Sequence, residues 1–318
     1  MDKRVSDILK LPEFGVSMAI IAVVIVFSSL SDRFLTAASF GVILTTGAEL
    51  GIMTIGIAFL MISGEFDLSV SSVFALAPLI VALFLMEGIN LGIALLVAFG
   101  VACLVGLFNG TIVEKMAIPS FIITLGTQMF LRGIVYAKTG GFPVKIVGHP
   151  LFREAMAGKF YKDFRVSIIW LAFLCIVFAL ILIRTRYGNW VFAVGGNKKT
   201  ARVMGIKVTK VKFLNFMLCS VLGAFAGIMA LSRFGAVGAT TGIGWELEAI
   251  AAAVIGGCLL TGGFGSIIGA VMGAILISLI KHGLVLVGAP SYWYTAFIGV
   301  ILIGAAILHV MIRRWAEK

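Results

Sequence analysis

Four carboxylates lie in or beside long apolar runs of this sequence, where ionisable side chains are rare. Glu49 lies inside one run, Asp67 follows the same run, and Glu246 and Glu248 occupy a similar place in the second half of the chain. An unpaired carboxylate buried in lipid costs several kcal/mol, so each must be paired, capped or exposed to water. For Glu49 two interpretations stay open: a group that lines a solute route, or a carboxylate hydrogen-bonded between helices.

Asp67 has a further interpretation, because it precedes a Leu-Ser pair at the start of the next apolar run. An Asp at such a position can cap a helix by accepting hydrogen bonds from the N–H groups of its first turn. Alternatively, this acidic turn and the one at Glu246 and Glu248 mark broken helices that line a translocation route. The sequence favours capping without excluding the route.

Uncharged polar side chains form a second group of candidates. Asn109, Thr124 and Gln128 lie in or beside two neighbouring apolar runs. Residues of this kind often hold helices together by hydrogen bonds. They also suit a neutral, hydroxyl-rich solute, which can exchange hydrogen bonds with water for hydrogen bonds with amides and hydroxyls. Both roles remain open.

Three ionisable residues, Arg132, Lys281 and His282, lie near the ends of their runs. Long cationic side chains at such positions can keep their charged ends in the headgroup region. We therefore expect them at the membrane surface rather than along a route.

The sequence contains no constellation typical of catalysis or of metal binding. Gly195 to Thr200 lacks the P-loop spacing, and neither GxSxG nor HExxH occurs. The four cysteines form no CxxC pair and no cluster with histidine. We predict that the chain is not an enzyme and has no catalytic residue, no metal site and no bound cofactor of its own.

The elements that must position these residues follow from the composition. The 318 residues are 61% hydrophobic and 12% charged, with a mean hydropathy of +1.16. Recurring apolar runs of about 20 residues predict an all-α polytopic membrane protein that forms a single transmembrane domain, 1–318. Ten runs are long enough to span a bilayer, so both termini should lie on one side; they are near 15–31, 39–62, 68–86, 90–110, 119–137, 166–184, 212–232, 246–262, 266–287 and 292–311.

Basic residues predict the orientation. The segment 184–212 holds eight Lys and Arg and no Asp or Glu, which places it on the cytoplasmic side. The same side then collects Lys115 and the basic residues of both ends, so we predict N-in and C-in. A competing signal is the predicted external loop 138–165, which holds six Lys and Arg. The net charge of +11 is explained by this orientation and by anionic headgroups, without a nucleic-acid partner.

The basic segment also contains a predicted short helix. Asn197 can act as its N-cap, Lys198 to Met204 gives about two turns, and Gly205 suits the left-handed residue that ends a helix. Such a helix could dock into a groove of a cytoplasmic partner, or it could anchor the chain to lipid headgroups.

A faint internal repeat relates the two halves of the chain. Phe66 to Ser72 resembles Trp245 to Ala251, and Ile118 to Phe121 resembles Ala289 to Tyr292. In the ten-span topology the members of each pair lie on opposite faces. This pattern predicts an inverted-topology repeat that relates spans 2–5 to spans 7–10.

Short motifs occur in a characteristic order from about Glu49 to Leu302: Gly64–Val70, Asn109-Gly110, Ile118–Thr127, Arg132-Gly133, Tyr187-Gly188, Gly195–Asn197, Ala201-Arg202, Gly205-Ile206, Glu246–Ala251, Ile255–Gly257 and Gly262–Gly265. Taken together and in this order, they resemble the permease subunits of bacterial ABC importers for simple sugars, the ribose, xylose and galactose group. One departure is the turn from Ser63 to Asp67, which carries an additional residue and an additional carboxylate relative to the usual Gly-Gly-Ile-Asp.

The resemblance implies a multi-pass protein of the bacterial inner membrane that imports a neutral monosaccharide by alternating access. Its implied partners are a second permease copy, a cytoplasmic ATPase that uses ATP and Mg, a periplasmic or lipid-anchored sugar-binding protein, and membrane lipid. The residues implied to couple to the ATPase are Gly196, Asn197, Ala201, Arg202, Gly205 and Ile206. The substrate-pathway candidates are Glu49, Asp67, Asn109, Phe121, Thr124, Gln128, Glu246 and Glu248.

The alternative function is an ion-coupled secondary transporter of a small polar solute, built on the same repeat. In that case Glu49, Asp67 or Glu246 would bind a proton or a sodium ion.

Overall fold

A computed structural model describes residues 12–146, 148–290, 292–300 and 303–304. The described chain is mostly helical, and seven of its helices are long and apolar enough to cross a membrane. They are α2 (Pro12–Leu30), α3 (Ala37–Ile62), α5 (Leu91–Met116), α6 (Ser120–Thr139), α8 (Val166–Arg184), α11 (Val208–Phe234) and α13 (Ile267–Leu286).

The shorter apolar helix α4 (Val70–Met86) corresponds to the third predicted span. The tenth predicted span, 292–311, is helical over 292–300 and lies in large part outside the described residues. The basic residues of both chain ends, which supported the predicted orientation, also lie outside them.

The eighth predicted span is wrong in its extent. Instead of a continuous helix over 246–262, α12 (Trp245–Ile255) has 11 residues and ends at Gly256. The chain then turns back on itself, with positive φ at Gly257, Gly262 and Gly263. An irregular backbone is tolerated at membrane depth only where protein covers it. Here Gly262 and Gly263 pack directly against the backbones of Gly64 and Gly196. The apolar stretch 246–262 is therefore a half-length helix followed by a folded loop, which hydropathy alone does not distinguish from one continuous span.

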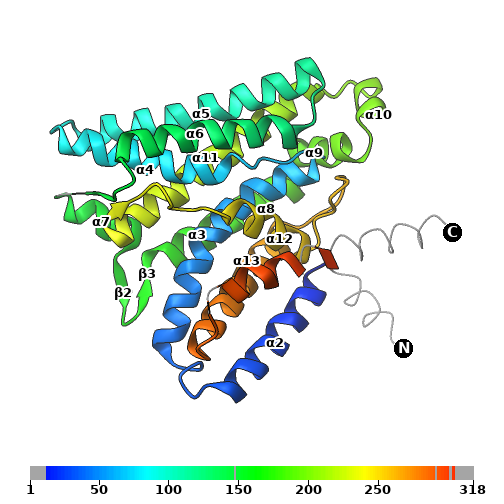
Figure 1. Cartoon of the computed structure of the whole chain (residues 1–318). Coiled ribbons are helices and arrows are strands. Elements are labelled where there is room, and N and C mark those ends of the chain that lie inside the picture. Colours follow the sequence, from blue (N-terminus) through cyan, green and yellow to red (C-terminus); the bar gives the residue numbers. More distant parts are fainter. Residues whose placement is uncertain (1–11, 147, 291, 301–302, 305–318) are drawn as a thin grey trace, which may run out of the picture.

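Helices α3 and α11 form the centre of the molecule and are the most buried of the long helices. Helix α3 packs against α13, α11, α12 and α8, whereas α11 packs against α5, α4 and α3. Small residues allow close crossings: a Cβ added to Gly56 of α3 would lie 2.7 Å from the Cα of Cys219 on α11. Figure 1 shows α3 running diagonally between the layer of α4, α5, α6 and α11 and the pair α13 and α2.

Two groups of short elements lie at opposite ends of the helices (Figure 1). One end carries α9 (Arg186–Gly196) and α10 (Lys198–Val203), and we call it the α10 end. The other end carries the segment 138–165, which contains α7 (Pro150–Ala157), β2 (Lys159–Tyr161) and β3 (Phe164–Arg165).

The strands add a small β component to the predicted all-α fold. Strand β2 pairs with β3, and β1 (Val144–Lys145) pairs antiparallel with β4 (Ala236–Val237), with Val144 opposite Val237. The β1–β4 pair ties the segment 138–165 to the loop that precedes α12. This contact fixes the entrance to α12 from the end opposite α10.

Candidate functional site

The predicted short helix is present as α10. Its N-cap residue, Asn197, accepts hydrogen bonds through Oδ1 from the N–H groups of Lys199 and Thr200, each at 3.0 Å. Gly205 has φ +82°, and the helix ends just before it. Both ends of α10 could be predicted from the sequence, because Asn is a preferred N-cap residue and Gly is the preferred left-handed residue after a helix.

A second helix, α9, precedes α10 and was not predicted. Thr185 caps it by accepting from the N–H of Gly188 at 3.2 Å. Gly195 lies against the carbonyl of Ile62, where any Cβ would overlap the oxygen, and the N–H of Gly263 donates to the same carbonyl at 2.8 Å. Helices α9 and α10 therefore rest directly on the end of α3.

Helix α10 buries one side and presents the other. Ala201 is buried, whereas Val203 and Met204 are 87% and 76% exposed. Two large apolar side chains are thus exposed at the end of this basic helix.

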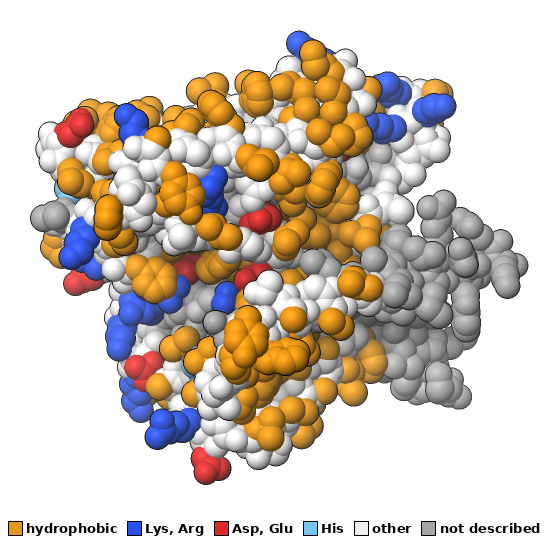
Figure 2. All heavy atoms as spheres, in the orientation of Figure 1, with side chains coloured by type: hydrophobic (Ala, Val, Ile, Leu, Met, Phe, Trp, Pro, Cys, Tyr) orange, Lys and Arg blue, Asp and Glu red, His pale blue; other side chains and the backbone are white. Residues whose placement is uncertain are grey.

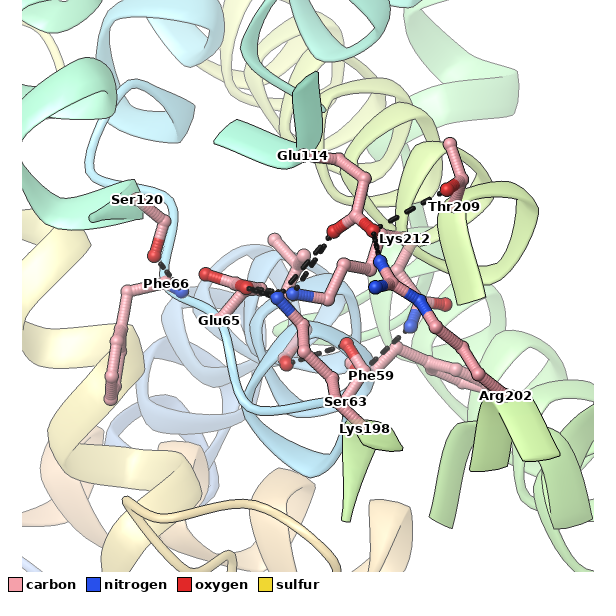
Figure 3. A network of polar contacts seen from close by, with 12 residues as sticks. Phe59, Ser63, Glu65, Phe66, Glu114, Ser120, Lys198, Arg202, Thr209 and Lys212 are labelled. Atoms are coloured by element: carbon pink, nitrogen blue, oxygen red, sulfur yellow. Dashed lines mark hydrogen bonds and ion pairs between the residues drawn. The ribbon is translucent and has the colours of Figure 1, made fainter. Parts of the chain in front are cut away.

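A network of charges connects α10 to the transmembrane helices (Figure 3). Two carboxylates, Glu65 and Glu114, face three cations. Glu114 at the end of α5 accepts from Nη2 of Arg202 at 2.6 Å, and its other oxygen lies 3.5 Å from Nζ of Lys198 and 3.6 Å from Nζ of Lys212. Lys212 of α11 also donates to Glu65, which follows α3, and Nζ of Lys198 lies 3.7 Å from the same carboxylate.

The side chains of the network differ in their exposure to solvent. The side chain of Lys212 is 1% exposed, whereas those of Lys198 and Arg202 are 45% and 59% exposed. Burial opposes the charge of Lys198, but the two carboxylates outweigh burial and raise its pKa above the ordinary value. The buried part joins α3, α5 and α11, and the exposed part belongs to α10, so α10 is linked by charge to the ends of three transmembrane helices.

A polar face forms a second cluster on the side of the molecule where α4, α6 and α12 meet. Nε2 of Gln128 donates to Glu246 at 2.7 Å and to Oγ of Ser71 at 3.1 Å. Arg132 donates to the carbonyls of Ser71, Ala239 and Thr241 at distances of 3.0, 2.9 and 2.7 Å. Gln128 and Arg132 of α6 thus hold the starts of α4 and α12 together.

The polar face continues onto α13 through Glu248, whose carboxylate lies 3.2 Å from Nζ of Lys281. This ammonium also lies 4.6 Å from the ring centre of Tyr294 and 5.6 Å from that of Trp245. Figure 2 shows acidic and basic side chains across the middle of one face, between two apolar areas. Charges at this depth cannot face lipid, so the polar face must be covered by protein or water.

Arg132, Lys281 and His282 were expected to extend to the headgroups, and all three residues are half-buried in the fold. Arg132 and Lys281 are bonded within the fold to partners far away in the sequence. Within the described part of the chain, Nε2 of His282 is buried without a hydrogen-bond partner. For Arg132 and Lys281, proximity to the end of an apolar run was a poor guide because their partners come from distant parts of the sequence.

The predicted carboxylate Glu49 is fully buried and forms a bidentate pair with Arg233 at the end of α11, with distances of 2.7 and 2.6 Å. It also borders a cavity of about 340 Å³ that is lined by Phe74, Thr241 and Trp245 among others. Glu49 thus has both of the features considered for it, a structural bond between helices and a position beside a cavity.

Asp67 and Asn109 belong to a buried network rather than to a surface. Oδ1 of Asp67 accepts from the N–H of Ser69 at 2.8 Å and from its hydroxyl at 2.6 Å, while Nδ2 of Asn109 donates to Oγ of Ser69 at 2.9 Å. Thr127 donates to Oδ1 of Asn109 at 2.7 Å. Asp67 does bind the backbone at the start of α4, but Ser69 is the N-cap residue. These contacts stabilise the junction of α4, α5 and α6.

The remaining predicted pathway residues are placed differently. Thr124 is buried and donates to the carbonyl of Ser120 in its own helix at 2.8 Å. Phe121 is 54% exposed. Of the predicted set, the structure brings Gln128, Glu246 and Glu248 together on the polar face, and it places Glu49 near Trp245 at the cavity.

The fold is thus that of a multi-pass helical membrane protein with a short capped helix at one end and a polar face at membrane depth. The chain belongs to the family described as the permease component of the branched-chain amino acid transport system, which it matches over residues 39–306. Members of this family are transport subunits, not enzymes, and the chain is accordingly a multi-pass permease of the inner membrane.

Several curated relatives align with nearly the whole chain. The chain is 30% identical to the ribose import permease protein of Bacillus subtilis over 93% of its own length and 92% of the relative. It is 33% identical to the autoinducer 2 import system permease protein of an Enterobacter strain, over 96% and 89% of the two chains. It is 31% identical to the ribose import permease protein of Escherichia coli, over 92% and 91%. No solved structure matches the chain.

Proposed function

We propose that the chain is the permease subunit of an ATP-driven importer for a neutral monosaccharide, a pentose, hexose or related polyol. The family match over 39–306 carries this proposal, and the names of the ribose import relatives support the solute class. The relative named for autoinducer 2 import widens the range of solutes to be tested. The uncharged and charge-paired groups of the polar face and cavity suit a solute without net charge.

The mechanism is alternating access by two related halves within one transmembrane domain. Helix α3 packs against α13 of the second half, and its counterpart α11 packs against α5 of the first half. An inverted repeat predicts this pattern if α3, α4, α5 and α6 correspond to α11, α12, α13 and the segment from 292. The first helix of each half then packs against the third helix of the other half. The half-length helix α12 and the turn before α4, whose Glu65 lies beside Lys198 of α10, then form the corresponding breaks in the two halves.

The α10 end is the cytoplasmic end and receives force from an ATPase with two nucleotide-binding domains. Exposed Val203 and Met204 provide the apolar part of the contact, and Arg202 links it to Glu114. The segment 138–165 lies outside, where a sugar-binding protein delivers the solute. A second permease copy covers the polar face, and ATP and Mg are bound by the ATPase.

The ion-coupled alternative has less support. Glu49 and Glu248 already hold Arg233 and Lys281, and Gln128 donates to Glu246. Glu49 is thus neutralised by a fixed cation and has little affinity left for a transported one, whereas Asp67 and Glu246 form no ion pair within the described residues. Two relatives are named as import permeases and a third as a probable ABC transporter permease, which favours the ATP-driven function.

Replacement of Arg202 by Glu tests the contact with the ATPase. Nη2 of Arg202 now lies 2.6 Å from Oε1 of Glu114. In the variant two carboxylates would face each other there, and the repulsion between like charges would displace α10. We expect co-purification with the ATPase and solute-stimulated ATP hydrolysis to fall by about tenfold or more while the permease still folds. Lys115→Glu is the matched control, since Lys115 is exposed near the same end and lies outside α10. Unchanged co-purification of the Arg202→Glu variant would contradict the docking assignment.

A further inference from the structure

Two hollows flank the first turns of α11 at the α10 end. The first, of about 320 Å³, is lined by Tyr187 and Trp190 of α9 together with Gly205 and residues of α11. The second, of about 650 Å³, lies on the other side and reaches Leu107 of α5. Lys207, Lys210 and Leu214 line both hollows and form the ridge between them.

Lys207 and Lys210 have no carboxylate partner among the residues that the structure describes. Both are exposed, and within the described ranges neither forms an ion pair. The nearby carboxylates, Glu65 and Glu114, are already occupied by Lys198, Arg202 and Lys212. In the described part of the chain, the ridge therefore begins with two unpaired positive charges.

The ridge changes character along α11. Lys207, Lys210, Leu214 and Met217 follow one face at intervals of three or four residues, so the face passes from cationic to apolar over about 15 Å. Leu107 and Phe213 continue the apolar part of the larger hollow. Trp190 is 41% exposed beside the smaller one, and Trp is enriched at the membrane–water interface.

From this arrangement we propose that the ridge is a binding site for an anionic phospholipid. The phosphate binds Lys207 and Lys210, and one acyl chain lies in the larger hollow along Leu214, Met217 and Leu107. Basic pockets between transmembrane helices at the cytoplasmic surface suit anionic headgroups. The charge is complementary, and the gradient from cationic to apolar matches a lipid rather than a free anion. This proposal rests on the cytoplasmic placement of the α10 end and does not depend on the transported solute.

The bound lipid would occupy the junction of α9, α10 and α11. It would contact α10 at Arg202, which lines the larger hollow and also binds Glu114. Bound lipid would thus be a structural component of the α10 end.

Native mass spectrometry of the purified full-length protein tests the site. The protein would be incubated separately with phosphatidylglycerol and with phosphatidylcholine of identical acyl chains, and retained lipid would be counted per chain. We expect phosphatidylglycerol to be retained preferentially, and Lys207→Ala combined with Lys210→Ala to lower its retention by about tenfold or more. Leu107→Trp should lower it as well by filling the larger hollow without a change in charge.

The matched control removes two other exposed lysines of the same end, Lys115→Ala with Lys199→Ala, and should retain phosphatidylglycerol as the unmodified protein does. Equal retention of the two lipids, or no effect of the Lys207 and Lys210 changes, would overturn the proposal. Displacement of the lipid by millimolar inorganic phosphate alone would also overturn it, because the site would then be a plain anion site.

Discussion

Replacement of Arg233 by methionine will destabilise the protein by about 3–5 kcal/mol, because it leaves the carboxylate of Glu49 buried without a counter-charge. Glu49 is 0% exposed, and both of its oxygens accept from the Arg233 guanidinium. The pair joins the middle of α3 to the end of α11, the two helices at the centre of the fold. Thermal unfolding in detergent, followed by the loss of monodisperse protein, would measure the effect.

A double variant separates the cost of the orphaned charge from the loss of packing. Glu49→Met combined with Arg233→Met removes both charges, and replacement of a whole buried ion pair by apolar residues is often neutral. We expect it to unfold at a temperature close to that of the unmodified protein. An Arg233→Met variant as stable as the unmodified protein would show that the pair does not hold α3 to α11.

Replacement of Lys212 by methionine is the second change with a large expected effect. Its ammonium lies between Glu65 and Glu114 and is almost completely buried, so its loss leaves two carboxylates with only the more exposed Lys198 and Arg202. We expect a destabilisation of about 3–5 kcal/mol, together with a loss of coupling between ATP hydrolysis and solute uptake. The expected signature is a lower number of solute molecules imported per ATP.

Lys198→Met is the matched control, because the same change is made at a member of the network that is 45% exposed. Exposed ion pairs contribute about 1 kcal/mol or less, so this variant should remain nearly as stable as the unmodified protein. Equal effects of Lys198→Met and Lys212→Met on stability and on coupling would contradict the prediction that the buried ion pairs contribute more than the exposed ones.

Hydropathy was a reliable guide to the long helices and failed at one glycine-rich stretch. The predicted spans at 39–62 and 166–184 differ little from α3 and α8, because a continuous apolar run of that length has few alternatives. The stretch 246–262 is as apolar as a span but contains Gly256 and Gly257. Its backbone leaves the helix there because neighbouring glycines, which come from distant parts of the sequence, make room for a turn.

Local signals predicted α10 in detail, whereas the polar partners of the interior could not be predicted. An N-cap and its N–H partners lie within three residues of each other, so Asn197 could be interpreted without the fold. Arg132 and Ala239 lie 107 positions apart, and Glu49 and Arg233 lie 184 apart. A cation near the end of an apolar run gives the same sequence signal whether it extends to headgroups or crosses to another helix.

Glu114 was missed for a related reason. It stands alone near the end of an apolar run, and only the fold brings it to Arg202 and Lys212. The available signal was the basic segment 184–212, which holds several cations and no acid of its own. Three of these cations, Lys198, Arg202 and Lys212, pair with carboxylates from elsewhere in the fold, Glu65 and Glu114.

The central claim is that solute import is driven by ATP through the α10 end. The most direct measurement is uptake of labelled ribose, followed by other pentoses and hexoses, into liposomes that contain the purified permease. We predict uptake only when the ATPase and ATP are present on the α10 side and the sugar-binding protein is present on the other. This uptake should persist when ionophores collapse the sodium and proton gradients. Accumulation driven by an ion gradient with the permease alone would contradict the account.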